Sequence, residues 1–205
     1  MTIRFSLTDS IAIGRYQKAP IYVHPTFFIT AAMLAFPFWS IGNLRGLGLA
    51  GLFIAVIFAS VLLHELAHAV TARRCGLLVL RIDIHALGGL VLFWYLPLKR
   101  SQDFAITLAG PMANLAIALV TLVLLASVPL EPTTIEIDGR IFFVLGTEKG
   151  FLEQLLRGSA YLNLGLCAVN LIPAFPLDGG KLVYLVITPA ALPSPRHARA
   201  CRRQR

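Results

Sequence analysis

Two histidines separated by three residues, with a glutamate directly after the first, form the group in this sequence best suited to chemistry. The string is His64-Glu65-Leu66-Ala67-His68. On a helix, residues four apart lie about 40° from each other around the axis, so His64 and His68 share one face. Two such imidazoles can bind one Zn²⁺, with Glu65 beside them as the base for an activated water. Histidines in this pattern also cap or line helices in unrelated proteins, so a zinc site needs a third ligand.

A candidate third ligand lies more than a hundred residues further on, in the stretch 170–180. Two prolines, Pro173 and Pro176, break the helix there, and Gly179-Gly180 follows Asp178. Irregular backbone at membrane depth is tolerated around a site. A catalytic zinc takes three protein ligands and leaves a fourth position for water, and Asp178 supplies a suitable oxygen. The predicted zinc ligands are therefore His64, His68 and Asp178, with one Zn²⁺ per chain.

The elements that carry these residues are predicted to be membrane helices. The 205 residues are 57% hydrophobic with a mean hydropathy of +0.77, above the roughly 45–50% apolar content of soluble domains. About 20 apolar residues cross a bilayer, and the chain has long stretches without charge at 19–44, 47–63, 104–130 and 158–177. The prediction is a mainly α, polytopic protein with about four transmembrane helices. Residues 1–192 form a single membrane-embedded domain, and 193–205 form a basic, disordered tail.

The charge distribution predicts how these helices are oriented. Residues 1–20, the loop 73–103 and the tail from 189 are net positive, whereas 129–150 is net negative. Because Lys and Arg mark cytoplasmic loops, both termini are expected in the cytoplasm, with 129–150 outside. The location predicted is the plasma membrane of a prokaryote. Nucleic acid is not expected as a partner, because no aromatic residues alternate with the basic ones.

The segment after the histidine helix changes character and is predicted to form a hairpin. Residues 78–84 alternate apolar and polar, Gly88-Gly89 marks a turn, and 90–96 is rich in β-forming residues. The expectation is a small membrane-re-entrant β hairpin whose edge holds an extended substrate peptide by strand addition; the alternative is a plain cytoplasmic loop. Ile11 and Ile13 indicate a further short strand or interfacial segment. A small hairpin is expected around 138–139.

Asparagines in the apolar stretches need polar partners. Asn114 follows the small residues Ala109, Gly110 and Ala113, which allow close approach of helices. Two interpretations of Asn114 stay open, packing between helices and a place among the substrate-binding residues with Gly88 and Gly89. His24 precedes Pro25 and is either an interfacial residue or a polar group facing the catalytic cleft.

These motifs together resemble the site-2 protease family of intramembrane zinc metalloproteases. The matching pieces are 64–68, 87–89, 110–114 and 170–180, with His24-Pro25 similar to a first-helix pattern of prokaryotic members. The resemblance implies His64, His68 and Asp178 as zinc ligands, Glu65 as general base, and Asn170 as an aid to the developing oxyanion. It also implies substrates that are single-pass membrane proteins, cut within or near the membrane on the cytoplasmic side.

One departure and two alternatives accompany this resemblance. Many family members continue past the Asp-Gly-Gly with two further helices, whereas 182–192 is a short apolar run, so the chain is expected to be a minimal or a shortened member. The alternatives to a protease are a catalytically inactive membrane scaffold and a zinc carrier or sensor. A carrier needs neither Glu65 nor Asn170, and a decayed site would not retain all ligands. Assembly into a homo-oligomer is left open.

Overall fold

The structure is a computed structural model that describes residues 10–39, 42–86, 88–94, 99–128, 132–137, 140–145 and 150–188. Its helices are α1 (Thr26–Leu34), α2 (Phe36–Trp39), α3 (Leu44–Arg74), α4 (Arg100–Ala126), α5 (Phe151–Asn170) and α6 (Asp178–Ile187). Its strands are β1 (Ile11–Tyr16), β2 (Ala19–Val23), β3 (Val79–His85), β4 (Gly88–Phe93), β5 (Pro132–Ile137) and β6 (Arg140–Leu145). The prediction of a mainly helical chain with a small sheet is confirmed.

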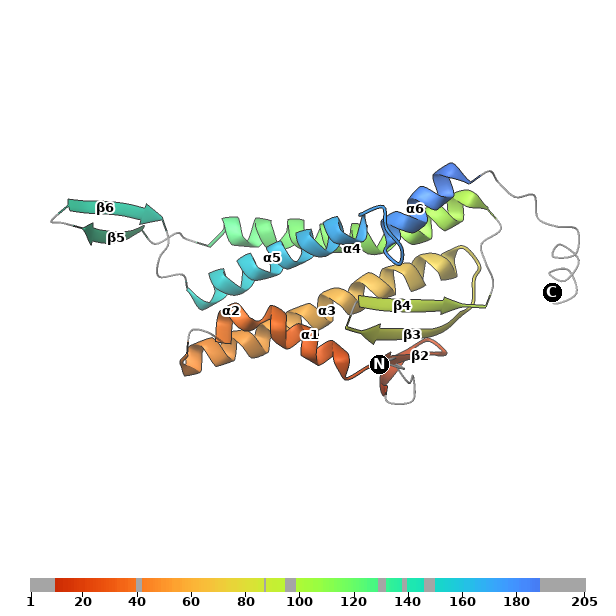
Figure 1. Ribbon diagram of the computed structural model, residues 1–205, viewed down its shortest axis with the longest axis horizontal. Coiled ribbons are helices and arrows are strands. Elements are labelled where there is room, and N and C mark those ends of the chain that lie inside the picture. The colour runs from red at the N-terminus through yellow and green to blue at the C-terminus, as the bar shows by residue number, and fades with distance from the viewer. Residues whose placement is uncertain are drawn as a thin grey trace, which may run out of the picture.

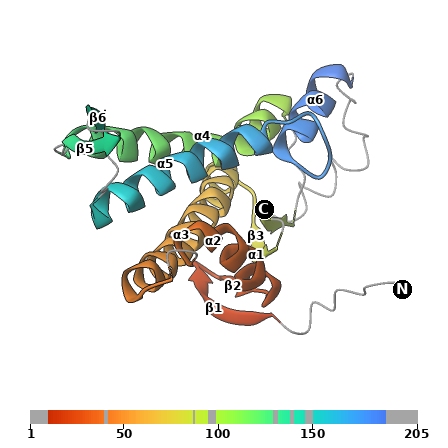
Figure 2. The same cartoon turned by 60° about the vertical axis from the view of Figure 1, so that its left-hand side comes forward.

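Helix α3 is the central element of the fold. Figure 1 shows α1, α2 and the sheet β1–β4 on one side of α3, and α4 and α5 on the other. In Figure 2, α4 and α5 lie side by side across α3. The β5–β6 pair lies at one end of the molecule, whereas α6 and the strands β3 and β4 lie near the other (Figure 1). The end of α3 that carries His64 and His68 is therefore enclosed by α4, α6 and the sheet.

Both ends of α3 are set by local sequence. At its start, the Asn43 side chain accepts a hydrogen bond of 2.8 Å from the Gly46 backbone, which satisfies one of the unpaired N–H groups of the first turn. At its end, Gly76 has φ +85° and donates to the Arg73 carbonyl, while Leu77 donates to the Ala72 carbonyl. This paired arrangement is a Schellman motif. It stops the helix sharply and directs the chain into β3.

The four-stranded sheet has the order β1-β2-β3-β4, and β4 is an edge strand. The predicted strand around Ile11 is confirmed as β1, and the predicted hairpin after the histidine helix is confirmed as the antiparallel pair β3–β4. Strands β2 and β3 are parallel, with Ile21 opposite Ile82. Three of their side chains, Val23, Ile82 and Ile84, are buried in the core. These buried side chains pack the sheet against the rest of the protein.

The predicted first span, 19–44, is wrong as a single helix. Residues Ala19–Val23 form strand β2, and the following residues form the short helices α1 and α2, separated at Ala35. Pro25 stands at the start of α1, and His24 donates its backbone N–H to the Ile84 carbonyl. The β-branched Ile21 and Val23 are buried against β3. This tertiary packing favours a strand at the start of the uncharged stretch, where the sequence alone predicts a helix.

The helices α3 and α4 are long and apolar enough to cross a membrane, with 31 and 27 residues. Helix α5 has 20 residues, and near its start the buried Glu153 pairs with the partly exposed Arg157 at 2.6 Å. Two candidate spans are thus found among the described residues, and the predicted set of four is taken up below. The antiparallel pair β5–β6 agrees with the predicted small hairpin, whose residues 138–139 lie outside the described residues, as does the tail 193–205.

The break between α5 and α6 positions Asp178. The segment 171–177 turns back tightly, and a Cβ on Gly180 would lie 2.6 Å from the Ala174 carbonyl carbon. Only glycine allows this close backbone contact. Helix α5 is itself joined to α3, because the Asn163 amide donates to the Ser60 hydroxyl at 3.0 Å and to the Ser159 carbonyl at 2.9 Å. Ser60 lies one turn before His64, so this hydrogen bond joins α5 to α3 near the histidines without contacting them.

We predict that Gly76→Ala lowers the stability of the protein by about 1–2 kcal/mol, because an L-residue is strained at this positive φ. Gly48 is the matched control. It lies inside α3 with open space around it, so Gly48→Ala is expected to stabilise the helix by about 0.5–1 kcal/mol. Unfolding midpoints of both variants in the same detergent provide the measurement. Equal midpoints for the two variants would contradict the assigned end of α3.

Candidate metal centre

Three buried side chains converge where α3, α4 and α6 meet. The Nε2 atoms of His64 and His68 lie 3.1 Å apart, and each lies 3.2 Å from Oδ2 of Asp178. All three residues are buried, and in the described part of the chain they form the one group of three His, Cys, Asp or Glu side chains close enough to hold a metal ion. The structure thus brings together the three residues that the sequence predicts as zinc ligands.

The dimensions and the chemistry of this triangle fit zinc. In a tetrahedral zinc site with bonds of about 2.0–2.1 Å, two ligand atoms lie about 3.3 Å apart. The three distances here are 3.1 and 3.2 Å. Two imidazole nitrogens and one carboxylate oxygen are also a ligand set that zinc prefers, and three protein ligands leave one position open. His64, His68 and Asp178 can therefore hold one Zn²⁺ together with a water molecule.

The tautomer of His68 is set by helix α4. Its Nδ1 lies 2.6 Å from the Ile106 carbonyl oxygen. A carbonyl can only accept a hydrogen bond, so Nδ1 carries the proton and Nε2 is left with its lone pair. A hydrogen-bond acceptor at one ring nitrogen orients a histidine ligand and makes its other ring nitrogen more basic. The Ile106 carbonyl therefore prepares His68 for metal binding through Nε2.

Gly110 leaves space beside the two histidines. A Cβ at this position would overlap Nε2 of His68 and would lie 2.5 Å from Nε2 of His64. An added side chain would therefore crowd the two nitrogens that face Asp178. The sequence predicts close helix packing at Gly110, but it does not predict that the two histidines are the neighbours. Sequence reasoning missed both the Ile106 carbonyl and the role of Gly110, since each depends on the packing of α4 against α3.

Glu65 lies between α3 and the edge strand β4. It is 4% exposed, and a Cβ on Gly89 would overlap its side chain, at 2.5 Å from Oε1. The β4 backbone therefore runs directly over this carboxylate. Gly88, with φ +119°, begins the strand after the turn. Glu65 follows His64 by one residue, so its side chain leaves the helix about 100° away from that of His64. It is placed beside the three ligand atoms without joining them.

Asp178 is held by the first turn of α6. Its Oδ2 faces the histidines, whereas Oδ1 accepts a hydrogen bond of 3.4 Å from the Lys181 ammonium group three residues later. The lysine is about half exposed. The two oxygens thus have different partners, and the one that faces the histidines is free to bind a metal.

Asn114 and Asn170 are the other two residues predicted for the site, and of these two only Asn114 contacts a predicted ligand among the described residues. The Asn114 amide lies with Nδ2 at 3.2 Å from Nδ1 of His64, so this residue meets a predicted ligand. Asn170 instead donates to the Leu166 carbonyl of its own helix at 2.9 Å. No hydrogen bond joins Asn170 to the three ligand residues in the described contacts. A role at the site requires its amide to leave the helix backbone.

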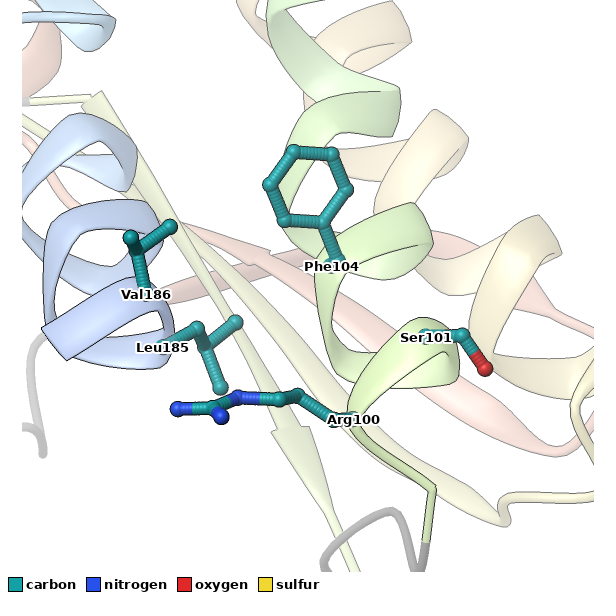
Figure 3. Close-up of a pocket in the computed structure, with 5 residues that line it drawn as sticks. All are labelled: Arg100, Ser101, Phe104, Leu185 and Val186. Carbon is teal, nitrogen blue, oxygen red and sulfur yellow. The ribbon is translucent and has the colours of Figure 1, made fainter. Parts of the chain in front are cut away.

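A separate pocket of about 320 Å³ lies between the first turn of α4 and the last turns of α6 (Figure 3). Its walls contain none of the residues discussed above. They are formed by Arg100, Ser101, Phe104, Leu185 and Val186. The Arg100 guanidinium also donates to the Thr188 carbonyl, which joins the two helices at this end. The pocket is therefore distinct from the metal centre.

Comparisons with known proteins agree with this geometry. The model of peptidase family M50 matches residues 52–202. A zinc metalloprotease of Methanocaldococcus jannaschii is 30% identical over 87% of this chain and 46% of its own length. Stage IV sporulation protein FB of Bacillus subtilis is 29% identical over 82% of this chain and 48% of its own length. This chain thus spans less than half the length of these relatives.

A solved structure is also similar. The site-2 protease from Methanocaldococcus jannaschii has 29% sequence identity and a TM-score of 0.60, over 87% of this chain and 71% of that one. With 29% identity, the two chains are similar in sequence as well as in fold. The match covers nearly nine tenths of this chain.

We predict that Gly110→Ala abolishes zinc binding, because the added methyl group overlaps Nε2 of His68 and crowds Nε2 of His64. Gly165→Ala is the matched control, since Gly165 lies in α5 with open space around its Cα. Zinc content of the purified proteins, measured by mass spectrometry, should fall from about one per chain to near zero in the first variant only. A Gly110→Ala protein with full zinc content would show that the metal is held elsewhere.

Proposed function

The chain belongs to peptidase family M50, the family of the site-2 proteases, and on this premise we propose that it is a zinc metalloprotease that cuts single-pass membrane proteins within or near the membrane. One observation carries the proposal. Glu65 lies next to two histidines and an aspartate that converge on one point, and an open strand edge passes over the same carboxylate. A base, a metal centre and a place for an extended peptide are what peptide hydrolysis requires.

The proposed roles follow from the positions of the side chains. His64, His68 and Asp178 hold the metal, with the proton of His68 kept on Nδ1 by Ile106. Zinc bound there supplies a Lewis acid that activates a water molecule and polarises the peptide carbonyl. The burial of the three ligands keeps bulk water from competing for the site.

Glu65 moves the proton in the proposed reaction. Its carboxylate takes one proton from the attacking water and passes it to the nitrogen of the departing amine, so that the peptide bond breaks as the new carbon–oxygen bond is completed. Asn170 is proposed to donate an N–H to the developing oxyanion after its amide turns away from the Leu166 carbonyl. One such donor contributes roughly 3 kcal/mol to the transition state.

The substrate segment is proposed to bind as an additional strand beside β4. This strand is the edge of the sheet, and Gly89 brings its backbone against Glu65. A peptide helix buries its amides in its own hydrogen bonds, so the substrate must unwind before it is cut. The free backbone groups of an edge strand offer replacement hydrogen bonds for the opened segment.

The membrane topology proposed here has four crossings with both termini in the cytoplasm of a prokaryotic cell. Helices α3 and α4 support two crossings by length and hydropathy. Helix α5 with α6, and the segment α1–α2, are proposed for the others, each with a break. Arg73 and Arg74 at the end of α3 and Arg100 at the start of α4 support a cytoplasmic position for these two helix ends, because Lys and Arg are enriched on that side.

Family membership and the site both favour a protease over the alternatives. A zinc carrier has no use for a buried carboxylate beside the ligands, and Glu65 is such a group. An inactive scaffold has no need for the space at Gly110 or for the open edge at β4.

We predict that Glu65→Gln lowers proteolysis by about 10²–10⁴-fold, because glutamine keeps the size of the side chain but cannot accept the proton. Zinc should stay bound. Fragments of single-pass membrane proteins are compared by mass spectrometry in cells that make equal amounts of wild-type or variant protein. Glu153→Gln is the matched control, a second buried glutamate that lies in α5 and pairs with Arg157. Near-normal cutting by zinc-loaded Glu65→Gln protein would remove the proposed mechanism.

The four-crossing topology predicts opposite labelling of two single cysteines. In a variant without Cys75, Cys167 and Cys201, Thr134→Cys should react with an impermeant maleimide added outside intact cells. Ser194→Cys should react only after the cells are opened. Equal reaction of both cysteines from outside would mean an even number of crossings between the two sites, which would contradict the four-crossing topology.

A further inference from the structure

The geometry points to Asn114 as a positioning residue that holds His64 in the tautomer required for zinc binding. This inference rests on the function proposed above and names one more residue that its metal centre needs. It concerns the side of His64 that faces away from the metal, where Nδ1 meets the Asn114 amide at 3.2 Å. The residue acts on the metal only through His64.

Zinc binding through Nε2 places a requirement on Nδ1 of each histidine. A neutral imidazole has one proton, so Nε2 has a free lone pair only when Nδ1 carries that proton. A buried N–H then needs an acceptor, since leaving it unpaired costs about 1–3 kcal/mol. For His68 the acceptor is the Ile106 carbonyl. For His64 the Asn114 amide is the polar group within hydrogen-bond distance of Nδ1 in the described contacts.

The Asn114 amide can meet this requirement in one of its two orientations. With Nδ2 facing His64, the amide donates, Nδ1 must accept, and Nε2 holds the proton. That arrangement suits the metal-free cluster, in which Nε2 lies 3.2 Å from an oxygen of Asp178. With the amide turned by half a rotation, Oδ1 accepts from Nδ1–H and Nε2 is free for zinc. We therefore assign the turned orientation to the zinc-bound protein.

The burial of Asn114 supports a role of this kind. The residue is 0% exposed, and its Oδ1 is buried without a hydrogen-bond partner among the described residues. Turning the amide exchanges its two ends, so that Oδ1 meets the Nδ1–H of His64 and Nδ2 takes the position that Oδ1 leaves. Ile106, Gly110 and Asn114 then occupy three successive turns on one face of α4, since residues four apart share a face. The three positions respectively orient His68, leave space for the metal and orient His64.

Packing between helices is the competing explanation for a buried asparagine, and the chain contains a matched example of it. Asn163 in α5 is also 0% exposed, but it bonds to Ser60 and Ser159 rather than to a ligand histidine. A substitution at Asn163 removes a buried amide of the same type without touching the metal ligands. It therefore separates loss of packing from loss of the hydrogen bond to His64.

The test compares zinc affinities of the full chain in detergent, measured by competition with a chromogenic chelator. Asn114→Leu keeps the volume but removes the acceptor, and its Kd for zinc should rise about 10–100-fold. Asn114→Asp keeps an acceptor that cannot donate when ionised, and its Kd should stay within about tenfold of wild type. Asn163→Leu should leave the Kd unchanged, even if the unfolding midpoint of the metal-free protein falls.

Two results would overturn the inference. One is a wild-type Kd for Asn114→Leu, and the other is an Asn114→Asp protein that binds zinc as weakly as Asn114→Leu. Should Asn114→Leu not fold, the Asn114→Asp protein decides alone, because a Kd more than tenfold above wild type contradicts an acceptor role. A wild-type chain that binds no zinc would overturn the proposed function as well, whereas zinc binding and proteolysis that are indifferent to Asn114 would overturn this inference only.

Discussion

The fold depends on holding two histidines and an aspartate within 3.1–3.2 Å of one another inside an apolar protein. Asp178 is 110 residues from His68 along the chain. The histidines come from α3, whereas Asp178 comes from α6, which follows the break after α5. Burying such groups is costly unless each has a partner. The surrounding elements supply these partners and the space, so much of the architecture is explained by the needs of this one cluster.

Helix α4 contributes to the centre without contributing a ligand. The Ile106 carbonyl orients His68, Gly110 leaves room beside the Nε2 atoms of both histidines, and Asn114 lies against His64. On the other side, the Asn163–Ser60 hydrogen bond ties α5 to α3 one turn from the histidines. The glycines after Asp178 let the chain fold back closely enough to present its carboxylate. The three ligand residues thus come from α3 and α6, and polar contacts from α4 and α5 hold α3 in place beside them.

Parts of this arrangement can be read from the sequence because they are local. The spacing of His64 and His68, the helix break before Asp178 and the alternation in β3 each depend on a few neighbouring residues. Strand β2 was missed because Ala19–Val23 opens a long uncharged run, and its parallel pairing with β3 involves residues some 60 positions away. The contributions of Ile106 and Gly110 were missed because a backbone carbonyl and an absent side chain carry no signal until α4 is packed against α3.

The most direct test of the central claim is zinc K-edge X-ray absorption of the purified full chain. The account predicts a first shell of nitrogen and oxygen atoms only, at about 2.0–2.2 Å, with the outer-shell scattering of two imidazoles. The chain also has Cys75, Cys167 and Cys201 as possible sulfur ligands. A sulfur shell at about 2.3 Å, or a spectrum with one imidazole or none, would contradict the assignment of His64, His68 and Asp178.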